Sequence, residues 1–196
     1  MIIHDKIIQG SPEWLDVKRG KFSCSTLSDL FMTKSTKGYN DAINKIVFER
    51  LTGETPESYS NADMKRGTEL EPYAREKYEM DTFNDVEQVG FIEHNSWFGF
   101  SPDGLIGSNG LIEIKCPRFT TLIDFALTRK IPKEYMYQMQ GGMLVSGRRW
   151  CDFVMFHPKM SLIVERVHRD NDIIADILSA VSDGAIEVEK RLKRLK

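Results

Sequence analysis

Two acidic residues and one lysine lie in a short stretch of the chain and could together support metal-dependent hydrolysis. Glu113 follows Asp103 by ten positions, and Lys115 comes two residues later in the run Leu-Ile-Glu-Ile-Lys. Alternate residues of a β-strand face the same side, so Glu113 and Lys115 are expected to point in one direction. Two carboxylates suit a hard divalent cation such as Mg²⁺, which prefers oxygen ligands and retains water. A neighbouring ammonium group can orient a metal-bound water or balance developing negative charge.

A turn between the two acidic residues would bring their carboxylates side by side. Ser108, Asn109 and Gly110 are predicted to form a hairpin turn, because Asn and Gly tolerate positive φ. The alternative is that Glu-x-Lys marks a solvated strand face with a cross-strand charge pair. The Ile and Leu neighbours of Glu113 favour the catalytic interpretation, since an unpaired charge in a buried strand is costly.

The composition is that of an ordinary globular protein. With 196 residues, 41% of them hydrophobic and 29% charged, the chain is expected to form one domain over residues 1–196. The net charge of −2 means that any nucleic-acid contact must come from a local patch. Cys24, Cys116 and Cys151 are far apart, which argues against disulfides and structural zinc and predicts reduced thiols in a cytoplasm. We find no signal peptide and no apolar stretch long enough to span a membrane.

Helical and strand patterns alternate along the chain. Helices are expected at 11–20, from Ser25 or Thr26, and at 40–51, 64–80, 120–130, 133–146 and 170–195. Strands are expected at 86–94, 97–102, 111–115, 150–156 and 162–167. This order predicts an α/β fold with a small mixed β-sheet flanked by helices.

Polar residues near the N-terminus have two interpretations each. Lys18, Arg19 and Lys21 cluster at the end of the first predicted helix, where positive charge is favourable without any ligand. Ser25 is predicted near the start of the next short helix. A hydroxyl and free backbone N–H groups at that position make an anion site, or simply an N-cap.

Two further polar residues lie on predicted helices. At 100° per residue, Glu71 falls about 20° from Tyr78, on the flank of an apolar stripe. The alternative is a capping box with Thr68, for which Pro72 would suit a helix that begins only at Thr68. Gln138 lies in a helix rich in Tyr and Met, where the default interpretation is a hydrogen-bonded amide at the edge of the core.

Four segments together resemble the phage lambda-type alkaline exonucleases, or YqaJ-like viral recombinases, of the PD-(D/E)XK nuclease superfamily. They occur in the expected order and cover residues 14–25, 66–75, 101–117 and 135–140. The third contains Ser-Pro-Asp-Gly followed by Glu-Ile-Lys-Cys-Pro, which is the superfamily signature. The resemblance implies a restriction-endonuclease-like core with a small mixed β-sheet flanked by helices.

The resemblance also implies a Mg²⁺ site, for which Mn²⁺ can substitute. The implied ligands are Asp103, Glu113, Glu71 and the carbonyl of Ile114. Lys115 would position or activate the attacking water, and Gln138 would lie beside the scissile phosphate. The five implied catalytic residues are Glu71, Asp103, Glu113, Lys115 and Gln138.

A second implied site holds the terminal 5′-phosphate of DNA. Its implied residues are Lys18, Arg19, Ser25 and Ser101. The family has an arginine in this pocket, whereas the aligned residue here is Lys18 with Arg19 next to it, so either cation could reach the phosphate. Met64 matches an apolar position that, in the family, wedges apart the terminal base pair.

The resemblance finally implies a function. The expected enzyme is a Mg²⁺-dependent 5′-to-3′ exonuclease that degrades linear double-stranded DNA and leaves 3′ single strands for phage-type recombination. It would act as a homotrimeric ring beside a single-strand annealing protein, in the cytoplasm of a bacterium that carries the phage or prophage. The alternatives are an endonuclease of the same superfamily in restriction or repair, and a catalytically silent DNA-end-binding protein. The intact Asp103, Glu113 and Lys115 argue against a catalytically silent protein.

Overall fold

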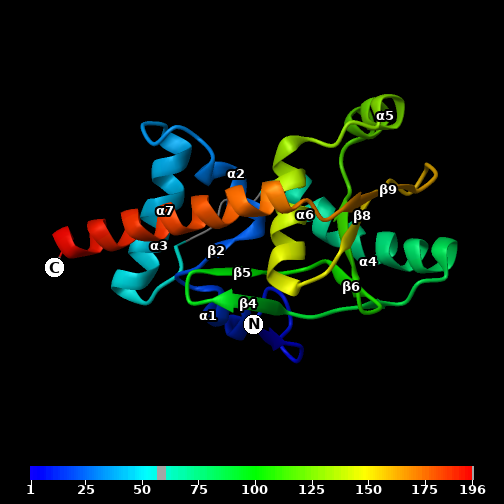
Figure 1. The fold of residues 1–196 in the computed structure, drawn as a ribbon. Coiled ribbons are helices and arrows are strands. Elements are labelled where there is room, and N and C mark those ends of the chain that lie inside the picture. Colours follow the sequence, from blue (N-terminus) through cyan, green and yellow to red (C-terminus); the bar gives the residue numbers. More distant parts are fainter. Residues whose placement is uncertain (57–60, 196) are drawn as a thin grey trace.

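A computed structural model describes residues 1–56 and 61–195, which form two mixed β-sheets with helices around them (Figure 1). One sheet has the order β1-β4-β5-β2, with bounds Ile2–His4, Phe91–Asn95, Phe98–Phe100 and Phe22–Ser23. The other has the order β3-β6-β7-β8-β9, with bounds Val86–Glu87, Gly104–Ile106, Gly110–Lys115, Trp150–Met155 and Ile163–His168. The α/β class with mixed sheet and flanking helices is confirmed. The strand predicted at 86–94 divides into β3 and β4, which belong to different sheets.

The helices pack around these sheets. Their bounds are Pro12–Lys18 (α1), Cys24–Thr26 (the 3-10 turn η1), Leu27–Leu30 (α2), Lys37–Thr52 (α3), Ala62–Thr82 (α4), Phe119–Thr128 (α5), Lys133–Ser146 (α6) and Asn171–Leu195 (α7). Helix α6 contacts strands of both sheets and lies near the centre of the molecule (Figure 1). No helix within the described ranges is long and apolar enough to cross a membrane.

The two faces of strand β7 are buried in different cores. Leu111 belongs to the larger core, which includes Met139 and Met143 of α6. Ile112 and Ile114 belong to a smaller core that also contains side chains of α4. Because side chains alternate along a strand, the odd-numbered residues of β7 face the larger core and α6.

Helix α4 runs without interruption through Pro72, as the predicted helix at 64–80 requires and contrary to the alternative start at Thr68. Its N-cap is Asn61, whose Oδ1 accepts a hydrogen bond of 2.9 Å from the N–H of Met64. The Thr68 hydroxyl donates to the Met64 carbonyl, so the alternative interpretation as a capping box is wrong. A proline in a helix interior costs about 3 kcal/mol. Tertiary contacts offset this cost, among them the hydrogen bond from the buried Tyr78 hydroxyl to Asp152.

Strands β6 and β7 form the predicted hairpin, but its turn lies earlier than expected. The pairs are Gly104 with Ile112, Leu105 with Leu111 and Ile106 with Gly110. The residue with positive φ is Gly107, at 49°, whereas Gly110 is already in β7. A Cβ at Gly110 would lie 2.3 Å from the ring of Trp150, so packing, not turn geometry, explains this glycine.

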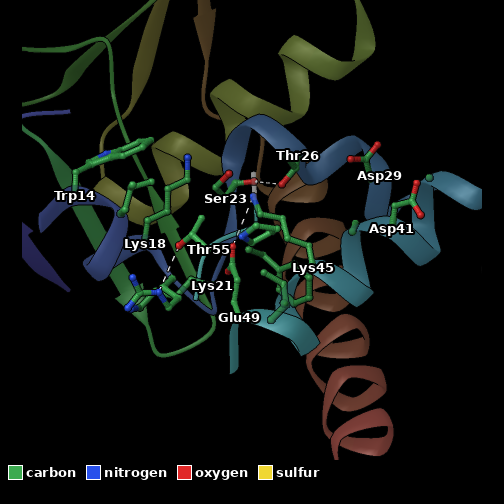
Figure 2. Close-up of a pocket in the computed structure, with 17 residues that line it drawn as sticks. Trp14, Lys18, Lys21, Ser23, Thr26, Asp29, Asp41, Lys45, Glu49 and Thr55 are labelled. Atoms are coloured by element: carbon green, nitrogen blue, oxygen red, sulfur yellow. Dashed lines mark hydrogen bonds and ion pairs between the residues drawn. The ribbon is translucent and has the colours of Figure 1, made fainter. Parts of the chain in front are cut away.

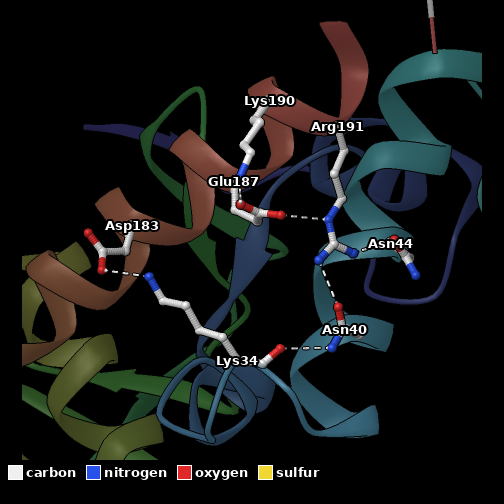
Figure 3. Close-up of polar contacts among 7 residues, drawn as sticks. All are labelled: Lys34, Asn40, Asn44, Asp183, Glu187, Lys190 and Arg191. Atoms are coloured by element: carbon white, nitrogen blue, oxygen red, sulfur yellow. Dashed lines mark hydrogen bonds and ion pairs between the residues drawn. The ribbon is translucent and has the colours of Figure 1, made fainter. Parts of the chain in front are cut away.

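The long helix α7 is fixed along α3 by polar contacts (Figure 3). Arg191 donates to the side-chain oxygens of Asn40 and Asn44, both at 2.7 Å, and pairs with Glu187. Helix α3 in turn holds the end of α1. Glu49 accepts a hydrogen bond from the Gly20 N–H, and Arg50 donates one to the Gly20 carbonyl. Side chains of α3 therefore hold the segment that follows α1.

Candidate active site

The β6–β7 hairpin brings Asp103, Glu113 and Lys115 together. Asp103 Oδ2 accepts a hydrogen bond of 2.7 Å from the backbone N–H of Ile114. The Glu113 side chain is 1% exposed, and its Oε1 lies 2.5 Å from Lys115 Nζ. The predicted juxtaposition of two carboxylates and one ammonium group is therefore present at the end of β7.

Backbone geometry adds a carbonyl oxygen to this cluster. In a strand, the N–H and C=O of one residue point to the same side. The pairing of β6 with β7 extends only to Ile112, which leaves the N–H of Ile114 free to bind Asp103. The Ile114 carbonyl consequently faces the side on which the Asp103 carboxylate lies, as its role as a ligand would require.

The cluster holds more negative charge than its surroundings favour. The pKa of Glu113 is raised to about 7, chiefly by burial and also by the nearby Asp103, against the opposing effect of Lys115. Burial and Asp103 likewise raise the pKa of Glu71 to about 7. Burial disfavours the charged form of Lys115, but the carboxylates outweigh it and raise the lysine pKa, which keeps the ammonium group charged. A divalent cation would relieve the repulsion between the carboxylates.

Arg75 is a site residue that sequence reasoning missed. It is 8% exposed; its Nη2 lies 2.5 Å from Glu71 Oε1, and its Nε donates to the Asp103 carbonyl at 3.1 Å. The amide of Gln88, with its oxygen turned toward Arg75, accepts from Nη1 at 2.9 Å. The spacing of Glu71 and Arg75 on one helix face was the available signal. This guanidinium ties α4 to the start of β6.

The oxygen atoms present fit Mg²⁺ better than a metal that needs an all-protein cage. Among the described residues, no group of three His, Cys, Asp and Glu side chains is arranged to hold an ion. Asp103, Glu113 and the Ile114 carbonyl offer two charged groups and one neutral oxygen. Mg²⁺ is commonly bound through one or two carboxylates and keeps several waters. Glu71 is engaged by Arg75, so its part in metal binding stays a prediction.

The two glutamines of α6 differ in their surroundings. Gln140 is 1% exposed and holds α7 in place, because its amide donates to the His168 carbonyl and accepts from the Asp170 N–H. Gln138 is only half-buried and lies one turn after Tyr135. The Tyr135 ring centroid is 4.9 Å from Lys115 Nζ, so this face of α6 borders the carboxylate cluster. Gln140 is therefore a hydrogen-bonded amide with a structural role, and Gln138 remains the candidate for contact with the scissile phosphate.

Lys18 and Ser101 are joined through Trp14. The indole Nε1 donates to Ser101 Oγ at 2.9 Å, and Lys18 Nζ lies 4.2 Å from the centroid of the indole ring. Arg19 instead pairs with Asp16 at 2.6 Å. Of the two cations considered for this region, only Lys18 is thus next to Ser101. Trp14 itself was not predicted as a site residue.

Ser25 is exposed, and its Oγ lies 3.0 Å from Ser23 Oγ. The helical segment begins earlier than predicted, with the 3-10 turn η1 at Cys24 and Ser23 as its N-cap residue. Ser25 is therefore not a cap. The turn η1 has three residues and α2 has four, too few for a strong helix-end effect. The Ser25 hydroxyl is the feature that remains.

Met64 lies in the first turn of α4 with 53% of its surface exposed. The preceding Asp63 pairs with Arg118 at 2.8 Å, and Arg66 donates to the Cys116 carbonyl at 3.0 Å. These contacts place the start of α4 beside the segment that follows β7. An exposed apolar side chain here is compatible with the predicted wedge.

A family model for the YqaJ-like viral recombinase domain matches residues 13–149, which contain every residue discussed above as a site candidate. The chain belongs to this family. A search of curated proteins gave no match. The matched range begins one residue before Trp14 and ends after the β6–β7 hairpin and α6.

Solved structures agree with this family membership. An alkaline exonuclease, LHK-Exo from Laribacter hongkongensis, is 39% identical, with a TM-score of 0.87 over 94% of this chain and 96% of that one. The same protein in complex with dAMP gives a TM-score of 0.89 at 39% identity, over 95% and 96% of the two chains. A phage-related exonuclease from Haemophilus somnus 129PT shares the fold, at 18% identity and a TM-score of 0.69 over 92% and 98%. The fold is the PD-(D/E)XK-like fold of the alkaline exonucleases.

Within this YqaJ-like fold, the predicted residues form two neighbouring groups. The first contains the carboxylate cluster with Glu71 at its edge, and the second contains Lys18 and Ser101 around Trp14. They are linked by the chain itself, because Ser101 precedes Asp103 by two residues. Arg19 lies outside both groups.

Proposed function

We propose that this protein is a Mg²⁺-dependent exonuclease that degrades linear double-stranded DNA from its 5′ ends and leaves 3′ single strands. The observation that carries the proposal is the buried Glu113 beside Lys115 and Asp103, in a chain 39% identical to an alkaline exonuclease over nearly its whole length. The complex of LHK-Exo with dAMP supports it, since a deoxynucleoside monophosphate is what stepwise hydrolysis of DNA releases.

The residues of the cluster have distinct roles in this reaction. Asp103, Glu113 and the Ile114 carbonyl would hold Mg²⁺, which when bound polarises the phosphate and makes water more nucleophilic. Lys115, kept charged by the carboxylates, stabilises the negative charge that develops during in-line attack. Glu71, oriented by Arg75, accepts a proton from the attacking water or positions that water. Gln138 contacts the scissile phosphate from α6.

Direction requires a site that recognises a strand end. Internal phosphodiesters are alike on both strands, whereas a terminal 5′-phosphate carries extra charge and extra acceptor oxygens. Lys18, Ser101 and Ser25 supply an ammonium group and two hydroxyls for this dianion. Because Ser101 is two residues from Asp103, a phosphate bound there lies close to the carboxylate cluster.

The assembly and partners that the family resemblance implies are compatible with the weak overall charge. A net charge of −2 gives the chain no overall positive charge with which to attract DNA. We propose that the subunits form a trimeric ring that encircles the duplex, so that the DNA is retained by enclosure. A single-strand annealing protein that binds the 3′ strand would complete phage-type recombination.

Recognition of the terminal phosphate predicts a substrate preference. Removing the 5′-phosphate from a linear duplex should slow digestion, and Lys18→Ala with Ser25→Ala should abolish the difference between the two substrates. Arg19→Ala is the matched control and should keep the preference, because Arg19 is paired with Asp16. Initial rates on paired substrates measure this, and equal rates for both ends with the unmodified protein would contradict the terminal site.

The exposed Met64 predicts an effect on strand separation. If its side chain separates the terminal bases, Met64→Ala should slow digestion of fully paired ends more than of frayed ends, since unstacking costs a few kcal/mol. Met80→Ala is the control, because Met80 is on the same helix and 66% exposed. Equal slowing on both kinds of end would return Met64 to an ordinary position on the helix surface.

A further inference from the structure

A cavity of about 790 Å³ lies between α1, the segment that leads into η1, and α3 (Figure 2). Its size is within the range of small-molecule sites. Lys18 lines it from α1, Lys45 lines it from α3, and Ser23 and Thr26 line it between them. The carboxylate cluster does not line the cavity, although Lys18 belongs to both the cavity and the group around Trp14.

Two lysines approach the cavity from opposite walls. Lys18 Nζ rests on the Trp14 ring, and among the described residues it has no ion-pair partner. The nearest carboxylate to Lys45 is Glu49 at 3.9 Å, the limit of an ion pair. Glu49 is also engaged elsewhere, because its Oε2 accepts from the Gly20 N–H at 2.7 Å. The Lys45 side chain is 47% exposed.

Hydroxyl groups connect this cavity to the proposed phosphate site. Ser23 is 8% exposed, and its Oγ lies 3.0 Å from the Oγ of Ser25. Ser25 is one of the residues proposed to bind the terminal phosphate. The serine pair thus forms a continuous polar wall from that site toward Lys45.

Glu49 also lines the cavity and partly offsets the positive charge of the two lysines. The other two cations of the cavity have partners of their own: Arg19 pairs with Asp16, and Lys21 Nζ donates to the Val17 carbonyl at 2.7 Å and lies 3.7 Å from Glu93. Asp29 and Asp41 lie at the opposite end of the cavity from Trp14 and Lys18 (Figure 2). The end near Lys18 is therefore suited to an anion.

The protonation of Lys18 agrees with this geometry. Burial, with the positive charge of Lys45 as the next cause, lowers the Lys18 pKa to about 8. The groups that face Lys18 are Trp14 on its own helix, Lys45 and Glu49 on α3, and Cys24 on η1. A bound dianion would stabilise both ammonium groups.

We propose that Lys45 is the second cation of the terminal 5′-phosphate site, so that the phosphate is bound between Lys18 and Lys45 above the Ser23–Ser25 pair. This inference rests on the proposed function and adds a residue from α3 to it. It also gives the cavity a role, as the space that admits the terminal nucleotide to the two lysines.

Binding without catalysis tests the proposal. Duplexes with a 5′-phosphate or a 5′-hydroxyl are titrated by fluorescence anisotropy without divalent cation, so that they stay intact. Lys45→Ala should weaken binding of the phosphorylated end about tenfold and leave the hydroxyl end within about twofold. Lys37→Ala is the control, since Lys37 is on the same helix, 89% exposed and paired with Asp41. It should change neither affinity.

The possible outcomes distinguish a failure of this inference from a failure of the proposed function. If the unmodified protein shows no preference for the phosphorylated end, the terminal site itself is wrong. If the preference is present and survives Lys45→Ala, the site stands and Lys45 has no part in it. A second readout is the pKa of Lys18, followed by NMR of isotope-labelled dimethyl-lysine, which should rise in Lys45→Ala. An unchanged pKa would show that the two lysines do not face one another.

Discussion

Asp103→Asn and Glu113→Gln are each expected to abolish cleavage while the protein remains folded. Both changes remove a negative charge from the cluster but keep the size of the side chain. Mg²⁺ binding and the stabilisation of the phosphate in the transition state should therefore be lost together. The measurement is the initial rate on linear duplex DNA at millimolar Mg²⁺. Asp124→Asn, at an exposed position on α5, is the control and should be fully active.

Stability distinguishes a lost metal site from a lost fold. The Glu113 pKa is raised to about 7 in the folded protein, so above that pH its charge destabilises the fold relative to the unfolded chain. Metal-free Glu113→Gln should consequently be at least as stable as the parent protein at pH 8, and the difference should disappear as the pH falls below the unfolded carboxyl pKa of about 4.3. Urea denaturation at both pH values measures this. An inactive but markedly less stable variant, or near-normal cleavage, would contradict the assignment.

Lys115→Ala is expected to lower the cleavage rate by about 10² or more. A preorganised charge beside the reacting phosphate has effects of this size. Lys115→Arg should not restore the rate, because a planar guanidinium does not replace a compact ammonium group held against Glu113 at 2.5 Å.

The control for Lys115 is Lys77→Ala, which removes an exposed lysine of α4 paired with Asp81. Single-turnover rates on linear duplex DNA compare the variants and separate cleavage from DNA binding. Normal cleavage by Lys115→Ala would mean that Lys115 serves only as the ion-pair partner of Glu113.

Local patterns were sufficient to predict the hairpin and the cluster. Strand periodicity placed Glu113 and Lys115 on one side of β7, and turn residues indicated the reversal that brings Asp103 close. The position of the turn was missed because Gly110 is required by the Trp150 ring, which is distant in sequence. The run of α4 through Pro72 was predicted, because the helical pattern at 64–80 includes this proline, and α4 begins only two residues earlier, at Ala62.

Contacts between distant segments could not be predicted from the sequence. Lys18 and Arg19 are adjacent in the chain, but Arg19 is the C-cap of α1 with a non-helical ψ of 136°. Their side chains therefore diverge. The family resemblance grouped both cations with Ser101, and the structure places Lys18 against the Trp14 ring that binds Ser101, whereas Arg19 pairs with Asp16. The hydrogen bond from Arg75 to the Asp103 carbonyl spans 28 residues, which no helical pattern reveals.

The direction of digestion, measured on end-labelled DNA, tests the central claim most directly. A linear duplex labelled at the 5′ end or at the 3′ end, and a closed circular duplex, are incubated with Mg²⁺ or with a chelator. We expect Mg²⁺-dependent release of labelled mononucleotide from the 5′ end, a long 3′-labelled single strand, and an intact circle. Nicking of the circle would indicate an endonuclease, and binding without release of nucleotides in Mg²⁺ would indicate a silent end-binding protein; either result would contradict the proposed exonuclease.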